Sequence, residues 1–268
     1  MSKSIVQPAS LPLTTRILAI ARHTLLEAWR SRSILLLVGM VLVVLLLSLF
    51  VRQQAITESD RAQVAFLAST TRLGSVFLLA ITVLQGSVRE FHDKVLELML
   101  SLDLPRSAYL TGKFLGYALL AVGYVAIVSL PLLLTVSAPI SVLRWGFTHM
   151  FELWIVIAFA LFCVTAFSQL LAAAAFVLAF YLLARSITAI QLISQSTLAE
   201  PGLTSNFAAL LADAIALVLP RLDAFSQTAW LVDAVAHPLS ITGAFLQTAI
   251  YVALLLCAAM FDLHRKNF

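Results

Sequence analysis

Long stretches of this sequence contain no charged residue, and that feature constrains the fold most. Residues 33–51 form the clearest such run, and at about 1.5 Å of rise per helical residue it is long enough to cross a bilayer. Only 11% of the residues are charged and 62% are hydrophobic, whereas a soluble domain is about a quarter charged. The sequence therefore predicts an all-α integral membrane protein, because helices satisfy their own backbone hydrogen bonds in lipid.

The apolar runs predict six transmembrane helices. The runs cover residues 33–51, 73–88, 114–143, 153–193 and 238–261. The run 153–193 is too long for one span of about 20 residues and just long enough for two. Its only polar break is Ser168-Gln169, where we predict a tight turn. The alternative is one long tilted helix, which gives five spans and an external C-terminus.

The lysines and arginines predict that both termini are cytoplasmic, because cytoplasmic loops carry an excess of these residues. The segments expected inside hold Lys3, Arg16, Arg22, Arg30, Arg32, Arg89, Lys94, Arg106, Lys113, Arg265 and Lys266; those expected outside hold Arg52, Arg61, Arg72, Arg144 and Arg221. We expect a multi-pass protein of a bacterial inner (plasma) membrane. This bias explains the net charge of +4 without nucleic acid as a partner.

Residues 14–32 precede the first span and predict an amphipathic helix. Its polar face holds Arg16, His23, Glu27 and Arg30, and its opposite face holds Leu18, Ala21, Leu25 and Trp29. We expect this helix to lie along the inner membrane surface. It serves either as a plain anchor or as a docking helix for a partner.

Residues 88–101 follow the second span and predict a second amphipathic helix. The pairs Arg89/Asp93 and Glu90/Lys94 lie four residues apart, which supports a helix, and apolar side chains form a stripe beside them. Mixed charges on an ordered helix favour a protein-docking surface over a lipid-binding one. A solvated loop is the alternative.

Residues 194–237 are expected outside the membrane. Asn206 is a candidate cap for a helix over 207–219 that Pro220 ends, and Asp223 is a candidate cap for a second helix that reaches Val235. The first helix is apolar but too short to span. We expect it to be re-entrant or to lie on the outer interface; a simple periplasmic cap is the alternative.

No motif for catalysis or cofactor binding is present. The only Gly-Lys pair is Gly112-Lys113, but Ser107 stands where a phosphate-binding loop needs its first glycine, and Phe114 follows the lysine. No Cys/His pair has metal-ligand spacing. We therefore predict a non-enzymatic chain that binds no metal or cofactor itself. Gly112 and Gly116 are candidates for close helix packing.

Acidic residues bear on the energy source. Ion-coupled carriers usually need acidic residues buried in their spans, and Glu152 is expected only at a span edge. This argues for an energy source outside the chain. Arg185 is the only ionisable residue expected well inside an apolar run; it either binds an anionic group or extends outward to the interface.

The stretch 89–113, with the helix 16–30 before the first span, resembles the permease subunits of type-2 ABC transporters, which are mostly exporters. Their first cytoplasmic loop commonly carries a Glu, an acidic-Leu-Leu-Leu-Ser-like run, Pro/Arg, and Gly-Lys entering the third span. The matching residues here are Glu90, Glu97, Ser101, Pro105, Arg106, Gly112 and Lys113. Asp93-Lys94 departs from the Gly-Thr often found there. The general layout also resembles permeases linked to multicopper-enzyme maturation.

The resemblance covers the whole chain and implies one permease domain over residues 1–268. Two permease copies, identical or not, would pair with two cytoplasmic ATPase subunits, which hold the ATP and Mg²⁺. Residues 88–101 would be the coupling helix, with helix 16–30 beside it. The implied ATPase contacts are Arg89, Glu90, Asp93, Lys94, Glu97, Arg16, Glu27 and Arg30. The implied path residues are Phe77, Gln85, Phe176 and Arg185.

Two other functions remain open from the sequence. One is a membrane scaffold or assembly factor without a transport cycle, and the other is an ion-coupled secondary carrier. The substrate is not readable from the sequence.

Overall fold

The computed structural model describes residues 12–54, 58–92, 105–167, 169–194, 203–232 and 240–265. These residues form helices and connecting turns, with no strand among them. Six of the described helices are long and apolar enough to cross a membrane. The prediction of an all-α, six-span membrane protein is therefore confirmed.

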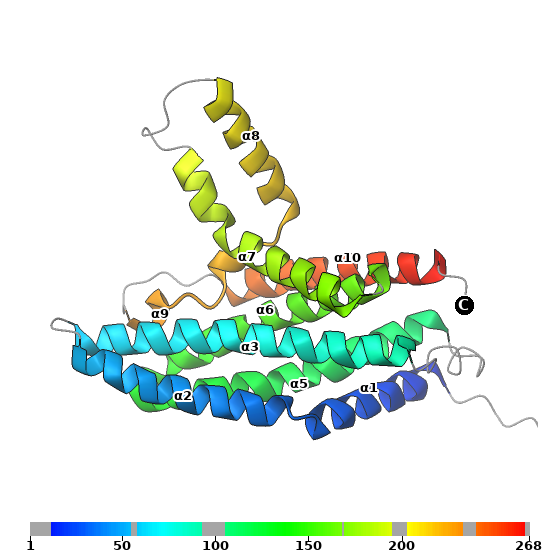
Figure 1. The fold of residues 1–268 in the computed structure, drawn as a ribbon, viewed down its shortest axis with the longest axis horizontal. Helices are drawn as coiled ribbons and strands as arrows, with labels where there is room; N and C mark the ends of the chain where they lie inside the picture. The colour runs from blue at the N-terminus through cyan, green and yellow to red at the C-terminus, as the bar shows by residue number, and fades with distance from the viewer. Residues whose placement is uncertain are drawn as a thin grey trace, which may run out of the picture.

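The helices follow one another along the chain in a simple order (Figure 1). Their bounds are α1 Leu13–Arg30, α2 Ser33–Gln54, α3 Ser59–His92, α5 Arg106–Thr135, α6 Pro139–Ala166, α7 Leu170–Ser194, α8 Leu203–Val218, the 3₁₀ turn η1 Leu222–Ala224, α9 Ala229–Val232 and α10 Ile241–Arg265. The predicted residues 93–104 lie outside the described part of the chain.

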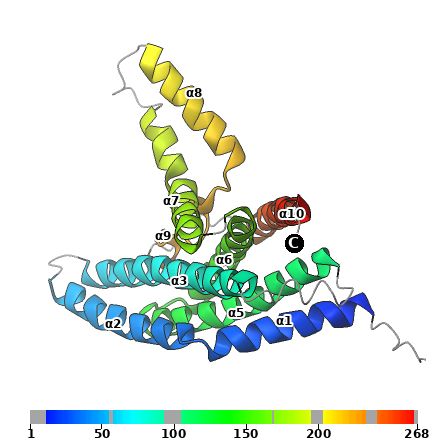
Figure 2. The same cartoon turned by 45° about the vertical axis from the view of Figure 1, so that its right-hand side comes forward.

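Helix α6 is the centre of the bundle. It contacts α3, α5, α7 and α10, and most of its residues are buried. Helix α2 packs on α3 and α1 packs on α5, so α1 and α2 follow each other along one side of the bundle (Figures 1 and 2). Side chains on α2 such as Leu35 and Leu46 are exposed, as expected of a helix that faces lipid.

The second span is longer than the predicted run 73–88. Helix α3 begins at Ser59 and continues to His92, so Arg89 and Glu90 prolong the span rather than start a separate helix. Arg72 was expected in an outer segment, but it lies inside α3 and its guanidinium donates to the Ser226 carbonyl. The prediction failed because charges paired within a bundle do not end a span.

The run 153–193 contains two helices, as predicted. Helix α6 ends at Ala166 and α7 begins at Leu170; Phe167 between them is extended, and Ser168 is outside the described residues. Stacked aromatic pairs hold the two helices together, Phe159 on Phe180 at 3.9 Å and Phe167 on Phe176 at 4.5 Å between ring centroids. The five-span alternative is wrong.

The region after α7 differs from the prediction in detail. Helix α8 starts at Leu203, so Asn206 lies inside it rather than at its cap. The expected second helix is reduced to η1 and α9 in the described residues, and Asp223 lies within η1. The last part of α7 and all of α8 form an arm that leaves the bundle (Figures 1 and 2). Gln191 donates to Asp213 across this arm at 2.8 Å.

Helix α1 packs closely on α5 through the glycines noted in the sequence. Its buried face holds Ile20, Ala21, Thr24 and Ala28, whereas Leu18 and Trp29 of the predicted apolar face are exposed. The reason is that the α5 surface at Gly112 and Gly116 accepts small side chains only.

We expect Gly116→Ala to loosen this contact. A Cβ at Gly116 would lie 2.7 Å from both the Ala21 carbonyl oxygen and the Thr24 Cβ, so the helices must separate, at a cost of about 1–3 kcal/mol. The measurement is the Tm of the purified protein in detergent. Gly123→Ala on the same helix is the control, because its Cβ meets only the Trp29 ring at 3.8 Å. Equal Tm values for both variants would contradict this packing.

Candidate functional site

The described residues place two groups of paired charges in the bundle. The first lies at the end of α3 that leads into residues 93–104. Glu90 is buried there, and its carboxylate forms an ion pair with the Lys113 ammonium group, which is also buried. The Tyr109 hydroxyl donates to the same carboxylate at 2.7 Å. This group joins α3 to α5.

A second ion pair joins α3 to α1. The Arg89 guanidinium contacts the Glu27 carboxylate, with the arginine side chain 65% exposed. Arg30 is exposed and Arg16 is half-buried on the same helix. Three helix ends are therefore tied together around the start of residues 93–104.

The predicted ATPase contacts thus fall into three sets. Arg89, Glu27, Arg16 and Arg30 lie near one end of the bundle with exposed or half-buried side chains, whereas Glu90 points inward. Asp93, Lys94 and Glu97 lie outside the described residues. The sequence did not indicate that Glu90 has an internal partner, although Lys113 was noted in the same motif.

The second group of charges lies in the middle of the bundle and centres on Glu152. Glu152 is the 14th of 28 residues in α6 and is fully buried, with about 20 Å of helix on either side. The expectation that Glu152 lies at a span edge is therefore wrong. The sequence-based boundary was drawn at this very charge, although a paired charge can sit inside a span.

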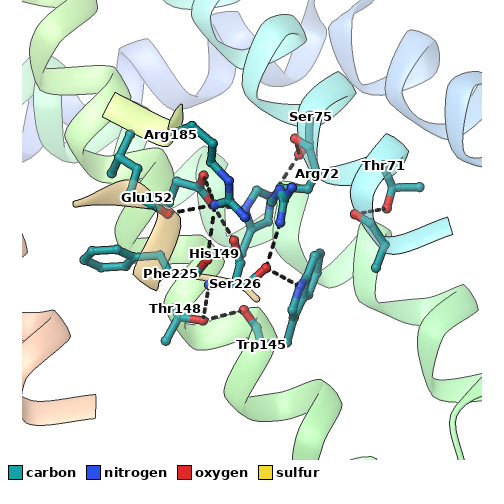
Figure 3. A network of polar contacts seen from close by, with 12 residues as sticks. Thr71, Arg72, Ser75, Trp145, Thr148, His149, Glu152, Arg185, Phe225 and Ser226 are labelled. Carbon is teal, nitrogen blue, oxygen red and sulfur yellow. Dashed lines mark hydrogen bonds and ion pairs between the residues drawn. The ribbon is translucent and has the colours of Figure 1, made fainter. Parts of the chain in front are cut away.

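Four side chains bind the Glu152 carboxylate (Figure 3). The donors and their distances are Ser226 Oγ at 2.7 Å, Tyr181 Oη at 3.0 Å, His149 Nδ1 at 3.1 Å and Arg185 Nη1 at 3.2 Å. They come from α6, α7 and the turn after η1. A buried carboxylate needs this degree of satisfaction, because removal from water is costly for a charge.

Arg185 binds an anionic group of its own chain. Its guanidinium contacts Glu152 and also donates to the Leu222 carbonyl at 2.7 Å and the Phe225 carbonyl at 3.1 Å. Of the two predicted alternatives, extension outward to the interface is contradicted. Arg185 instead fixes η1 to α6 and α7.

Ser226 is the point at which the loop after η1 enters the bundle (Figure 3). Its carbonyl accepts hydrogen bonds from Arg72 at 2.8 Å and Trp145 at 3.0 Å, and its amide donates to Thr148 at 3.2 Å. Its φ of 43° is in the left-handed region, which non-glycine residues rarely adopt. The buried contacts compensate for this strained backbone.

Ser75, His149 and Glu152 form a chain of contacts in the order found in hydrolases. Ser75 Oγ lies 2.9 Å from His149 Nε2, and His149 Nδ1 lies 3.1 Å from Glu152. All three side chains are fully buried, and Ser75 Oγ also lies 2.8 Å from the Arg72 carbonyl. We therefore assign this chain of contacts to holding α3 against α6.

An apolar groove lies between α3 and α7, beside this central group. It is lined by Leu73, Val76, Phe77, Ala80, Ile81, Leu84, Ala174, Val177, Leu178 and Tyr181. Of the predicted path residues, Phe77 lines it; Gln85 and Phe176 are exposed outside its lining, and Arg185 belongs to the central group. The two segments predicted to face each other across a path are therefore neighbours.

The central group was missed by sequence reasoning, although one signal was available. An arginine isolated in an apolar run, as Arg185 is, needs a counter-ion, and Glu152 was the nearest acid in the same run. Among the described residues, no three His, Cys, Asp or Glu side chains are grouped to hold a metal ion. No protein-family model matches this chain, and no curated protein matches it either.

Proposed function

We propose that this chain is the transmembrane permease subunit of an ATP-binding cassette transporter, most plausibly an exporter. A separate cytoplasmic ATPase would bind residues 88–101 and the adjacent end of α1, and a second permease copy would complete the transporter. The observation that carries the proposal is the tying of both ends of residues 93–104 into the bundle by Glu90–Lys113 and Arg89–Glu27.

This arrangement suits the transmission of movement. A force applied to residues 93–104 acts on α3 through Glu90 and on α5 through Lys113, and it reaches α1 through Arg89. Because α3 also forms one wall of the apolar groove, its displacement would change the groove. ATP-driven closure of the partner would thus open a path without any nucleotide chemistry in this chain.

Charge reversal in the proposed docking segment tests the proposal. We expect Glu97→Lys to abolish co-purification of an ATPase subunit from the native membrane while the permease remains folded, because a docking helix relies on charge complementarity. Asp60→Lys is the matched control, since Asp60 is an exposed acid at the other end of α3. The proposal fails if the unmodified chain purifies without an ATPase, or if both variants lose the partner equally.

One observation favours a second function, an ion-coupled carrier. The buried Glu152 removes the argument that the spans lack a deep acid. A carrier would move its substrate on an ion gradient in proteoliposomes that contain no ATP, whereas the permease alone would not. A scaffold would show neither transport nor an ATPase partner.

A further inference from the structure

The groove between α3 and α7 differs from other apolar surfaces of the chain because one end of it meets buried charge. The Tyr181 ring lines the groove, while the Tyr181 hydroxyl donates to Glu152 at 3.0 Å. The wall of the groove therefore continues into the central group of charged residues without a break.

The central group is not neutral. Arg72 and Arg185 contribute two positive charges and Glu152 one negative charge, which leaves +1 even with His149 neutral. Asp223, the acid on the adjacent turn, makes no hydrogen bond to either arginine in the described structure. In addition, Arg72 Nε is buried without a hydrogen-bond partner. An anion would supply both the missing charge and a missing acceptor.

The rest of the groove is apolar and extended. Its lining on α3 runs from Leu73 to Leu84, a length of about 16 Å along the helix, close to half of the roughly 30 Å hydrocarbon core of a bilayer. It holds about 350 Å³, part of which is open to the outside. Only two helices form its walls, so it has the shape of a site for one chain.

From these features we infer that the groove binds an anionic single-chain amphiphile, with its acyl chain along α3 and α7 and its carboxylate at the Tyr181 end, facing Arg72. As a statement about the transported substrate this inference rests on the proposed function. As a statement about binding it requires only the purified chain.

The test uses the full chain in detergent and palmitate that carries a photoreactive diazirine on its acyl chain. We expect the label on α3 and α7 peptides that line the groove, as mapped by mass spectrometry. The methyl ester and the trimethylammonium analogue of the same chain should label about tenfold less, because neither provides a carboxylate for charge-assisted hydrogen bonds. Equal labelling by the three head groups, or labelling elsewhere, would overturn the inference without any variant.

A pair of variants one residue apart provides a second measurement. Ala174 lines the groove, whereas Ala175 is exposed outside its lining. Ala174→Trp should fill the groove and reduce palmitate labelling about tenfold, and Ala175→Trp should leave it unchanged. Equal labelling of both variants would contradict the assigned position.

A second copy of the chain is the competing occupant. In a Cys257→Ser background, which removes the exposed native cysteine, Phe77→Cys would then form a disulfide-linked dimer and palmitate would not label the groove. That result overturns the inference. Neither outcome depends on an ATPase, so the binding site and the proposed function fail or succeed separately.

Discussion

Glu152→Ala should unfold or nearly unfold the protein. Removing one member of a buried ion pair leaves the other charge uncompensated, which typically costs about 3–5 kcal/mol. Here Arg185 and Arg72 would both face each other without their shared counter-ion, and His149, Tyr181 and Ser226 would lose an acceptor. The measurement is the Tm and the yield of monodisperse protein in detergent.

Two comparisons separate this effect from a general sensitivity to acid removal. Asp60→Ala deletes the acid of an exposed pair with Arg52, and such pairs contribute about 0–1 kcal/mol, so this variant should be close to the unmodified chain. Glu152→Gln keeps the shape and an acceptor but removes the charge. Combining it with Arg185→Met should recover about 1–3 kcal/mol relative to Glu152→Gln alone, since the two residues are in contact. Additive losses would show that the two charges do not stabilise each other.

The parts of the fold that the sequence predicted are those set by contact with lipid. The run 33–51 is apolar on every side because α2 exposes most of its surface, so absence of charge was a sufficient criterion. The break near Ser168 was also local, because a polar pair interrupts two apolar runs. Gly112 and Gly116 were visible as a spacing, and the structure places them against α1.

The central group could not be predicted in the same way, because its contacts join residues far apart in the chain. Ser226 is 74 residues from Glu152 and 154 from Arg72, and no local pattern specifies either contact. Charges were treated as span boundaries, which displaced Arg72 and Glu152 to the edges. A charge within a helix marks a boundary only if it lacks a partner in the bundle, and that is a tertiary property.

The pair Glu90–Lys113 should behave like the central pair, with a consequence for function. Lys113→Met leaves the buried Glu90 carboxylate without its cation and should cost about 3–5 kcal/mol in the free energy of unfolding. Replacing both members often restores stability, so Glu90→Gln with Lys113→Met should recover most of the loss. The exchanged pair, Glu90→Lys with Lys113→Glu, keeps both charges and should remain folded. Thermal unfolding in detergent checks all three.

The exchanged pair also decides what Glu90 does in the proposed transporter. Because Glu90 is buried against Lys113 and Tyr109, we expect it to act by joining α3 to α5 rather than by touching a partner. A folded exchanged variant should then bind the ATPase as the unmodified chain does, whereas Glu97→Lys should not. If the exchanged variant is stable but loses the ATPase, Glu90 is itself a contact, and the end of α3 must open when the partner binds.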